Sequence, residues 1–207
     1  PIPNYFDDGT PGPNNWYAGS RGNMPVYKAL EISANRPAAN ICNMYTPQLC
    51  YKFMTEKLHF TTLTEDDGNS ISGMALGGMT NGLTVKEMVA GFQIFGNGGK
   101  YYKPYTYYYI EDNDGNVILD NRNAIGEQAV SAGVAEVMNK ILQKPIYGSE
   151  GTGTDAAIEG WTVYGKTGTT DDSRVRYFVG YTPYYCAAVW TGYPSTNEKI
   201  SASGNPA

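Results

Sequence analysis

Three short segments near the end of the chain constrain its fold most, because each is rich in residues that favour β-strands. The segments 161–167, 176–182 and 185–193 are alternating or continuously apolar, and Gly, Asp and Pro residues link them. Short strands joined by such turn residues pair most readily as antiparallel neighbours. The sequence therefore predicts a sheet in which these three strands lie side by side.

The first half of the chain carries apolar residues at helical spacing instead. Residues 1–22 are dense in Pro, Gly, Asn and Asp, which predicts a winding loop. Three short helices joined by tight corners are predicted over about 25–32, 37–45 and 47–58. Proline lies in the first turn of each, and Thr46 is the expected cap of the third.

A longer loop and a well-defined helix are expected next. Polar and glycine residues dominate 59–81, so a long loop is predicted there. The sequence Thr84-Val-Lys-Glu87 is a capping box, and it opens a helix that we expect to end at Gly98-Gly99. The predicted apolar stripe of this helix consists of Met88, Val89, Phe92 and Phe95.

A hairpin and a further helix are predicted after it. The strand-like runs 101–111 and 116–119 are separated by Asp114-Gly115, the signal of a tight hairpin turn. Helical spacing returns over 125–142, which predicts another core helix. Its expected buried positions are Val130, Val134, Val137, Met138 and Ile141.

Helices followed by antiparallel strands indicate an α+β fold in which helices cover one face of the sheet. The helical part is expected over about 23–99, and the sheet part over about 101–119 and 161–193. Neither an internal repeat nor a linker divides residues 1–207, so one domain is predicted, or most of one.

Charge and composition exclude several classes of function. The chain has 15 Lys and Arg against 20 Asp and Glu, a formal charge of -5, which repels phosphate backbones. We therefore expect no nucleic-acid partner. No apolar run approaches the roughly 20 residues that span a bilayer, so any membrane attachment is expected outside this sequence. The 18 tyrosines suit a carbohydrate or peptide groove, or half-buried strand positions.

The cysteines and the single histidine predict neither a metal site nor a cofactor. Cys42, Cys50 and Cys186 contain no C-x-x-C pair, and His59 has no second histidine to join it. Cys42 and Cys50 could pair if two helices meet there. Ordinary buried thiols are the alternative.

A lysine followed by glycine and hydroxyl side chains is the sharpest local feature. The segment Gly165-Lys166-Thr167-Gly168-Thr169-Thr170 leads from one predicted strand toward another. It lacks the G-x-x-x-x-G-K-[ST] order of a phosphate loop and does not precede a helix. On its own it could be a plain turn with an exposed lysine.

The surrounding passages give this segment a family context. Residues 164–170, 177–183 and 188–193 together resemble the penicillin-binding transpeptidases, in which a K-T-G strand borders the active-site groove. Upstream, Ser33-Ala-Asn35 resembles the S-x-N element of that family. Passages typical of its class A members are 75–78, 83–88 and 95–104.

The resemblance covers about Tyr5 to Tyr193 and implies roles for individual residues. Ser33 is expected to relay protons, and Asn35 to hold the amide of the acyl donor. Lys166 is expected to attract the substrate carboxylate and to lower the pKa of a neighbouring lysine. Without the resemblance, Ser33 and Asn35 could simply be helix-corner caps. The implied substrate-binding edge consists of Thr167, Gly168, Thr169 and Thr170.

The function implied is a peptidoglycan D,D-transpeptidase that cross-links stem peptides by serine acyl transfer and reacts with β-lactams. The parent protein is expected to be membrane-anchored, with this domain outside the cytoplasm. Two alternatives remain open: a non-catalytic sensor of stem peptides or β-lactams, and a serine β-lactamase. Arg176-Tyr177 departs from the family, which commonly has tryptophan just before the Phe-Val-Gly run.

The family's nucleophile motif, S-x-x-K, is absent from the sequence. No serine is followed by lysine three positions later; Ser33, for example, is followed at that distance by Arg36. We therefore expect a fragment trimmed at both ends, lacking the segment with the nucleophile and inactive alone. An uncovered sheet face is also expected, which would allow self-association.

Overall fold

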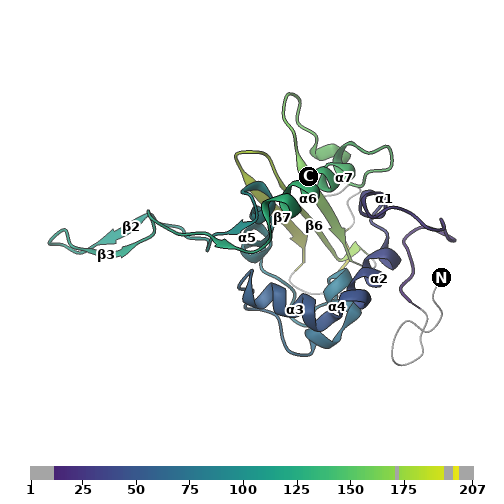
Figure 1. Cartoon of the computed structure of the whole chain (residues 1–207), viewed down its shortest axis with the longest axis horizontal. Coiled ribbons are helices and arrows are strands. Elements are labelled where there is room, and N and C mark those ends of the chain that lie inside the picture. The colour runs from purple at the N-terminus through teal and green to yellow at the C-terminus, as the bar shows by residue number, and fades with distance from the viewer. Residues whose placement is uncertain (1–11, 171–172, 194–197, 201–207) are drawn as a thin grey trace.

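The computed structural model describes residues 12–170, 173–193 and 198–200, and its centre is a three-stranded antiparallel sheet (Figure 1). The strand order is β5 (Tyr164–Thr169), β6 (Val175–Tyr181) and β7 (Cys186–Gly192). Lys166 lies opposite Val179 in the register of β5 and β6. The prediction of three adjacent antiparallel strands is confirmed. The first half of the predicted N-terminal loop lies outside the described residues.

The predicted run of three helices and two tight corners is also present. These helices are α1 (Val26–Glu31), α2 (Asn35–Tyr45) and α3 (Pro47–Glu56). Thr46, with φ 68°, forms the second corner, and its hydroxyl accepts a hydrogen bond from Leu49 N. Helix α2 begins two residues before Pro37, so Asn35 is already part of its first turn.

The segment 59–81 contains structure where only a loop was predicted. A 3-10 helix, η1 (Asp67–Asn69), is followed by the helix α4 (Ile71–Leu76). The hydroxyl of Ser70 caps α4 by accepting from Gly73 N. A helix of six residues is too short to show helical periodicity, which explains why the prediction was wrong here.

Helix α5 (Val85–Gly96) begins with the predicted capping box, but its most buried face is not the predicted stripe. Ala90 and Ile94 are buried, whereas Met88 and Phe92 are only partly buried. The small residues let α5 approach its neighbours closely. A Cβ atom on Gly91, for example, would lie 2.8 Å from Phe60 Cζ.

The carboxylate of Glu87 connects the start of α5 to the segment before it. It accepts hydrogen bonds from the backbone N–H of Thr61 (2.6 Å) and of Thr84 (3.0 Å), and from the hydroxyls of Thr61, Thr62 and Thr84. Burial alone would raise the pKa of Glu87, but these hydrogen bonds outweigh it and lower the pKa to about 2.

The predicted hairpin forms, but apart from the main sheet. Its strands are β2 (Tyr109–Glu111) and β3 (Val117–Asp120), and the turn contains Gly115 with φ 81°. A second strand pair, β1 (Lys100–Tyr101) with β4 (Glu127–Gln128), lies at its base. Figure 1 shows the hairpin as an arm that extends away from the body. The interval 101–119 is therefore not part of the main sheet, contrary to the prediction.

The last helical region starts later than predicted and buries a different face. Helix α6 (Ala132–Leu142) begins after Ser131, whose hydroxyl accepts from Val134 N. Val134 and Val137 are 49% and 56% exposed, while Ala135 and Leu142 are buried. Valine at these positions gives helical spacing without marking the core. Beyond α6 follow α7 (Lys144–Tyr147) and the 3-10 helix η2 (Thr154–Ala156).

Helices lie against both faces of the sheet, not against one as predicted. Cys186 in β7 donates to Val89 O in α5, which places α5 on one face. On the other face, Phe178 in β6 packs against Ile146 in α7 and against Val163. Val189, which pairs with Phe178, is 46% exposed, so this second face is partly open near β7. Self-association through it stays a prediction.

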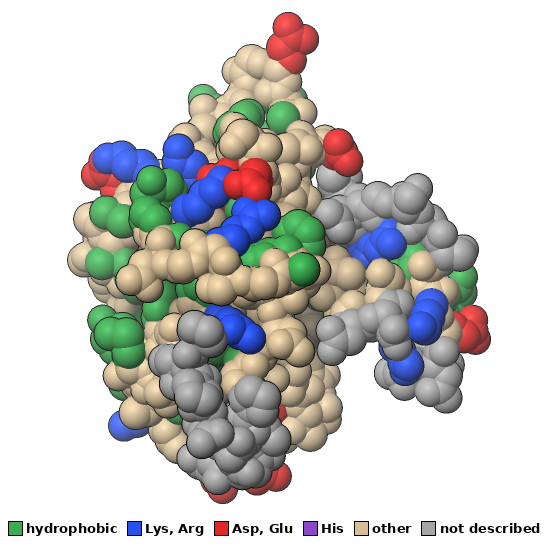
Figure 2. All heavy atoms as spheres, turned by 90° about the vertical axis from the view of Figure 1, so that its right-hand side faces the viewer, with side chains coloured by type: hydrophobic (Ala, Val, Ile, Leu, Met, Phe, Trp, Pro, Cys, Tyr) green, Lys and Arg blue, Asp and Glu red, His purple; other side chains and the backbone are tan. Residues whose placement is uncertain are grey.

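Charged side chains attach α1 to the segment that leads into β5. Glu31, 4% exposed, accepts hydrogen bonds from Lys28 Nζ (2.7 Å) and from Glu150 N (3.1 Å). The Glu150 side chain forms ion pairs with Lys28 and Arg21. Figure 2 views the molecule from the side of α1 and α2 and shows basic and acidic side chains gathered in one area of this face.

We predict that Glu87→Gln lowers the free energy of unfolding by about 2 kcal/mol at neutral pH, because a charged acceptor of five hydrogen bonds is lost. The folded-state pKa lies below the usual value, so this stability is present above about pH 4.3 and is lost as pH falls toward 2. Urea unfolding at several pH values measures both effects. Glu159→Gln, which changes an exposed carboxylate, is the control. An unchanged acid slope in Glu87→Gln would contradict the assignment.

Candidate active-site groove

A groove of about 420 Å³ lies between the helical part and the edge strand β5. Ser33 and Asn35 lie on its helical side, and Lys166, Gly168 and Thr169 lie on β5. The structure thus brings together residues more than 130 positions apart in the sequence, as predicted. The apolar part of the wall includes Ala38, Ile41, Ala75, Leu76, Met88, Phe92 and Val179.

Lys166 and Ser33 contact each other directly across the groove. Lys166 Nζ donates to Ser33 Oγ at 2.8 Å and to Thr167 O at 2.7 Å. Burial lowers the pKa of Lys166 to about 8, because a charged ammonium loses solvation in this position. The lysine is therefore still mostly charged at neutral pH, but it gives up its proton far more readily than an exposed lysine.

Ser33 is held in a backbone conformation that serine rarely adopts. Its φ is 52°, in the left-handed region. The hydrogen bonds Ser33 N to Leu30 O and Ala34 N to Ala29 O form a Schellman motif at the end of α1. Glycine is the usual residue at this position, so serine carries a conformational cost there. Strained residues of this kind cluster at functional sites.

We predict that Ser33→Gly is more stable than Ser33→Ala by about 1 kcal/mol. Both variants lose the hydroxyl, but only alanine keeps a Cβ atom in the left-handed conformation. Chemical denaturation of the two variants side by side measures the difference. Equal stabilities, or a more stable alanine variant, would show that the left-handed conformation of Ser33 is wrong.

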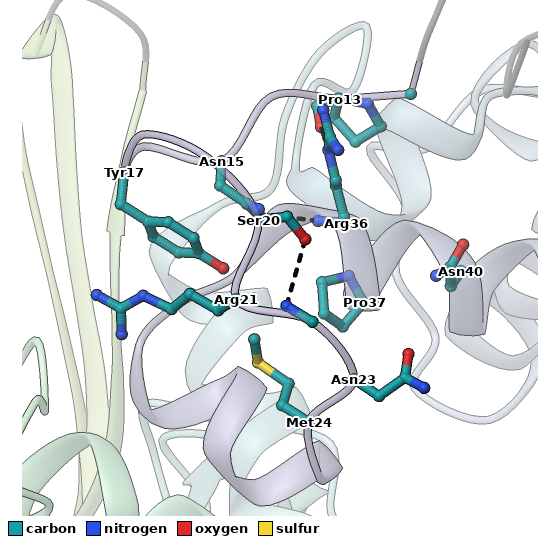
Figure 3. Close-up of a pocket in the computed structure, with 12 residues that line it drawn as sticks. Pro13, Asn15, Tyr17, Ser20, Arg21, Asn23, Met24, Arg36, Pro37 and Asn40 are labelled. Atoms are coloured by element: carbon teal, nitrogen blue, oxygen red, sulfur yellow. Dashed lines mark hydrogen bonds between the residues drawn. The ribbon is translucent and has the colours of Figure 1, made fainter. Parts of the chain in front are cut away.

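A loop over 12–24, which we call the strap, holds the start of α2. Asn15 Oδ1 accepts from the backbone N–H groups of Asn35 and Arg36, and Asn35 Nδ2 donates to Asn14 O. Figure 3 shows Asn15 beside Arg36 and the strap curving around a second pocket, of about 310 Å³. The Asn35 side chain is therefore oriented by the strap as well as by the helix.

Two of the three threonines predicted along the substrate-binding edge have hydroxyls that bond to other residues of the chain. Thr167 reaches the groove, but its Oγ1 lies 2.6 Å from Thr152 Oγ1. The Thr170 hydroxyl donates to Val175 O and accepts from Val175 N, closing the turn between β5 and β6 outside the groove. Strand alternation explains the first correction, since neighbours of Lys166 point away from it.

Gly168 and Thr169 both line the groove, as predicted. A Cβ atom built on Gly168 would meet only Tyr177 Cβ within 4 Å, at 3.4 Å. The groove-side face of β5 is therefore open at this position. This leaves room for another extended segment to approach the backbone of β5.

Tyr177 is a groove residue to which sequence reasoning gave no role. It lines the wall beside Lys166, and burial raises its pKa. Among the described residues its hydroxyl is buried without a hydrogen-bond partner. The only sequence signal was that tyrosine stands where the resembling family commonly has tryptophan. That signal indicated a changed groove shape, not a buried polar atom.

An α+β domain with Ser-x-Asn facing Lys-Thr-Gly across one groove has the arrangement of a penicillin-binding transpeptidase domain. A comparison with family models agrees: the model described as "Penicillin binding protein transpeptidase domain" matches residues 5–204. The chain belongs to this family.

Curated proteins with similar sequences are penicillin-binding proteins. The chain is 40% identical over 144 residues to penicillin-binding protein 1A of Clostridium acetobutylicum, covering 70% of the chain and 17% of that protein. It is 32% identical over 197 residues to penicillin-binding protein 1A of Clostridium botulinum, covering 93% of the chain and 23% of that protein. The chain thus spans about a fifth of the length of these relatives.

Solved structures share the fold. Penicillin-binding protein PonA1 of Mycobacterium tuberculosis superimposes with a TM-score of 0.77 at 22% identity, covering 96% of this chain and 55% of that one. Penicillin-binding protein 1A of Haemophilus influenzae gives a TM-score of 0.74 at 19% identity, covering 90% and 32%. The α+β fold predicted from the sequence is confirmed by these matches.

Residues 12–170, 173–193 and 198–200 contain neither a membrane-spanning helix nor a cluster of metal ligands. No helix there is both long and apolar enough to cross a membrane. No cluster of three or more His, Cys, Asp and Glu side chains able to hold a metal ion occurs in the same ranges.

Proposed function

We propose that this chain forms the Ser-x-Asn and Lys-Thr-Gly sides of the active site of a D,D-transpeptidase, which cross-links peptidoglycan stem peptides by serine acyl transfer. The observation that supports it best is the 2.8 Å hydrogen bond from Lys166 Nζ to Ser33 Oγ across the groove. A hydroxyl and a buried amine in contact form a path along which a proton can move to a leaving nitrogen.

Lys166 serves two purposes in this proposal. As an ammonium it attracts the terminal carboxylate of the stem peptide or the carboxylate of a β-lactam. Its positive charge also lowers the pKa of a second lysine nearby, because two like charges in one desolvated groove repel. The lowered pKa of Lys166 itself shows that the groove already disfavours charged amines.

The acyl donor binds as an added strand along β5. This strand is at the edge of its sheet, and Gly168 leaves space beside the backbone. Backbone hydrogen bonds to an extended peptide would then place its scissile carbonyl near Thr169, whose N–H contributes to the oxyanion hole. Asn35 holds the side of the peptide that faces the helices.

The nucleophile comes from a Ser-x-x-Lys segment outside the 207 residues, since no serine of the sequence has lysine three positions later. A complete protein of this kind acts outside the cytoplasmic membrane, where peptidoglycan is cross-linked. This location, the stem-peptide substrate and the reaction with β-lactams all belong to the proposal.

We predict that the chain alone forms no stable covalent adduct with a fluorescent penicillin, whereas the same chain joined to the Ser-x-x-Lys segment of its parent gene does. In the joined protein, Ser33→Ala should slow acylation by about 100-fold or more, because the proton path is interrupted. Gel fluorescence over time measures the rate. Labelling of the chain alone would show that the nucleophile is within the 207 residues.

The acylated protein then separates the proposal from its two rivals. A transpeptidase passes an acyl group from a stem-peptide substrate to an added D-amino acid, and mass spectrometry detects the product. A sensor keeps the penicillin adduct and forms no transfer product, and a β-lactamase releases hydrolysed penicillin. A stable adduct without a transfer product, or release of hydrolysed penicillin, would contradict the transpeptidase proposal.

A matched threonine pair tests the geometry of the β5 edge. We predict that Thr169→Val lowers the acylation rate of the joined protein by about 10-fold, since in the proposed binding mode the hydroxyl of this groove-lining residue contacts the substrate carboxylate. Thr170→Val should change that rate less than about 2-fold, because the Thr170 hydroxyl bonds to Val175 at the turn, outside the groove. A larger loss of rate in Thr170→Val than in Thr169→Val would overturn the proposed role of Thr169 in binding the carboxylate.

A further inference from the structure

Two cysteine side chains meet where α2 and α3 join. Cys42 lies in α2 and Cys50 in α3, and a single residue, Thr46, separates the two helices. The two Sγ atoms are 3.9 Å apart. A disulfide bond measures about 2.05 Å, so the sulfurs must approach by about 2 Å, which side-chain rotation with a small helix shift can supply.

The corner keeps the two thiols together. Thr46 adopts φ 68° and caps α3 through Leu49 N, which restricts how the second helix leaves the first. Pro47, the first residue of α3, is buried and adds to this restriction. The proximity of the two sulfurs therefore follows from the backbone geometry of the corner.

We infer that Cys42 and Cys50 form a disulfide when the folded chain meets a disulfide oxidant, either an oxidised small thiol or a thiol–disulfide oxidoreductase. Cys50, the more exposed of the two, loses its proton and attacks a sulfur of the oxidant, whose other sulfur leaves as a thiolate. Cys42 then loses its proton and attacks Cys50 Sγ, and the second thiolate leaves. Two thiols are oxidised and one disulfide is reduced to two thiols.

The third cysteine provides an internal comparison. Cys186 lies in β7, and its thiol donates to Val89 O instead of facing another cysteine. Burial raises the pKa of both Cys42 and Cys186, to about 12 and about 11, so neither reacts readily by itself. Only Cys42 has a more exposed cysteine beside it to start the exchange.

A disulfide between Cys42 and Cys50 would restrict the movement of α2, which forms one wall of the groove. Asn35 begins α2, and Ala38 and Ile41 from the same helix line the groove. Joining α2 to α3 restricts the movement of α2, the helix that carries these groove residues, relative to α3. An oxidising location outside the cytoplasm is part of the proposed function, whereas the geometry of the two sulfurs is independent of it.

The test counts and locates thiols in the full folded chain. After incubation with oxidised and reduced glutathione at an oxidising ratio, we expect free thiols to fall from the three present in the reduced chain to one. Peptide mass spectrometry after alkylation should show Cys42 linked to Cys50 and Cys186 alkylated. The melting temperature should rise by roughly 5 °C relative to the reduced chain.

Two matched variants test whether the disulfide joins Cys42 to Cys50. Cys186→Ser should still lose two thiols, whereas Cys50→Ser should lose none and show no rise in melting temperature. Three remaining thiols in the folded wild-type chain, or a bond that includes Cys186, would overturn the inference. Neither result would affect the transpeptidase proposal, which is tested by acylation and transfer.

Discussion

The position of Ser33 opposite Lys166 depends on a buried carboxylate, that of Glu31. Glu31 lies two residues before Ser33 and accepts hydrogen bonds from Lys28 Nζ and from Glu150 N, in the segment that leads toward β5. Burial would raise its pKa, but these hydrogen bonds outweigh burial and lower it. A buried charge is tolerated only when it is paired in this way. Glu31 therefore links α1 to the segment before β5.

The close fit around this carboxylate shows how little freedom the link has. A Cβ atom on Gly148 would lie 2.4 Å from Glu31 Cδ, so only glycine fits at this position. The strap adds a second attachment, because Trp16 Nε1 donates to Ile32 O at 2.7 Å. Ser33 thus follows a helix end that is fixed from two sides, which allows its left-handed conformation to persist.

Local sequence signals predicted the fold well wherever one residue type decides the local structure. The capping box at Thr84, the cap at Thr46 and the Asp-Gly turn all appear where expected, because each acts within a few residues. The failures come from tertiary packing. Val134 and Val137 have helical spacing yet face solvent. The strands between residues 101 and 119 pair outside the main sheet. Periodicity gives the type of an element, not the partner it packs against.

The same contrast between local sequence signals and tertiary packing applies to the candidate site. Ser33, Asn35 and Lys166 could be named from motif order, and the structure places all three in one groove. Strand alternation alone turns Thr167 away from Lys166, but the motif could not reveal its partner Thr152, which lies between α7 and η2. Nor could it reveal the buried hydroxyl of Tyr177. Motifs identify which residues meet, while orientation is decided by the sheet.

The same burial that brings Lys166 into the groove also sets its chemistry. Desolvation is what lowers its pKa to about 8, so the value depends on the walls that keep water out. An arriving carboxylate favours the charged amine, whereas a second lysine favours the neutral one. In the proposed function, Lys166 therefore alternates near neutral pH between binding a carboxylate and exchanging a proton with Ser33.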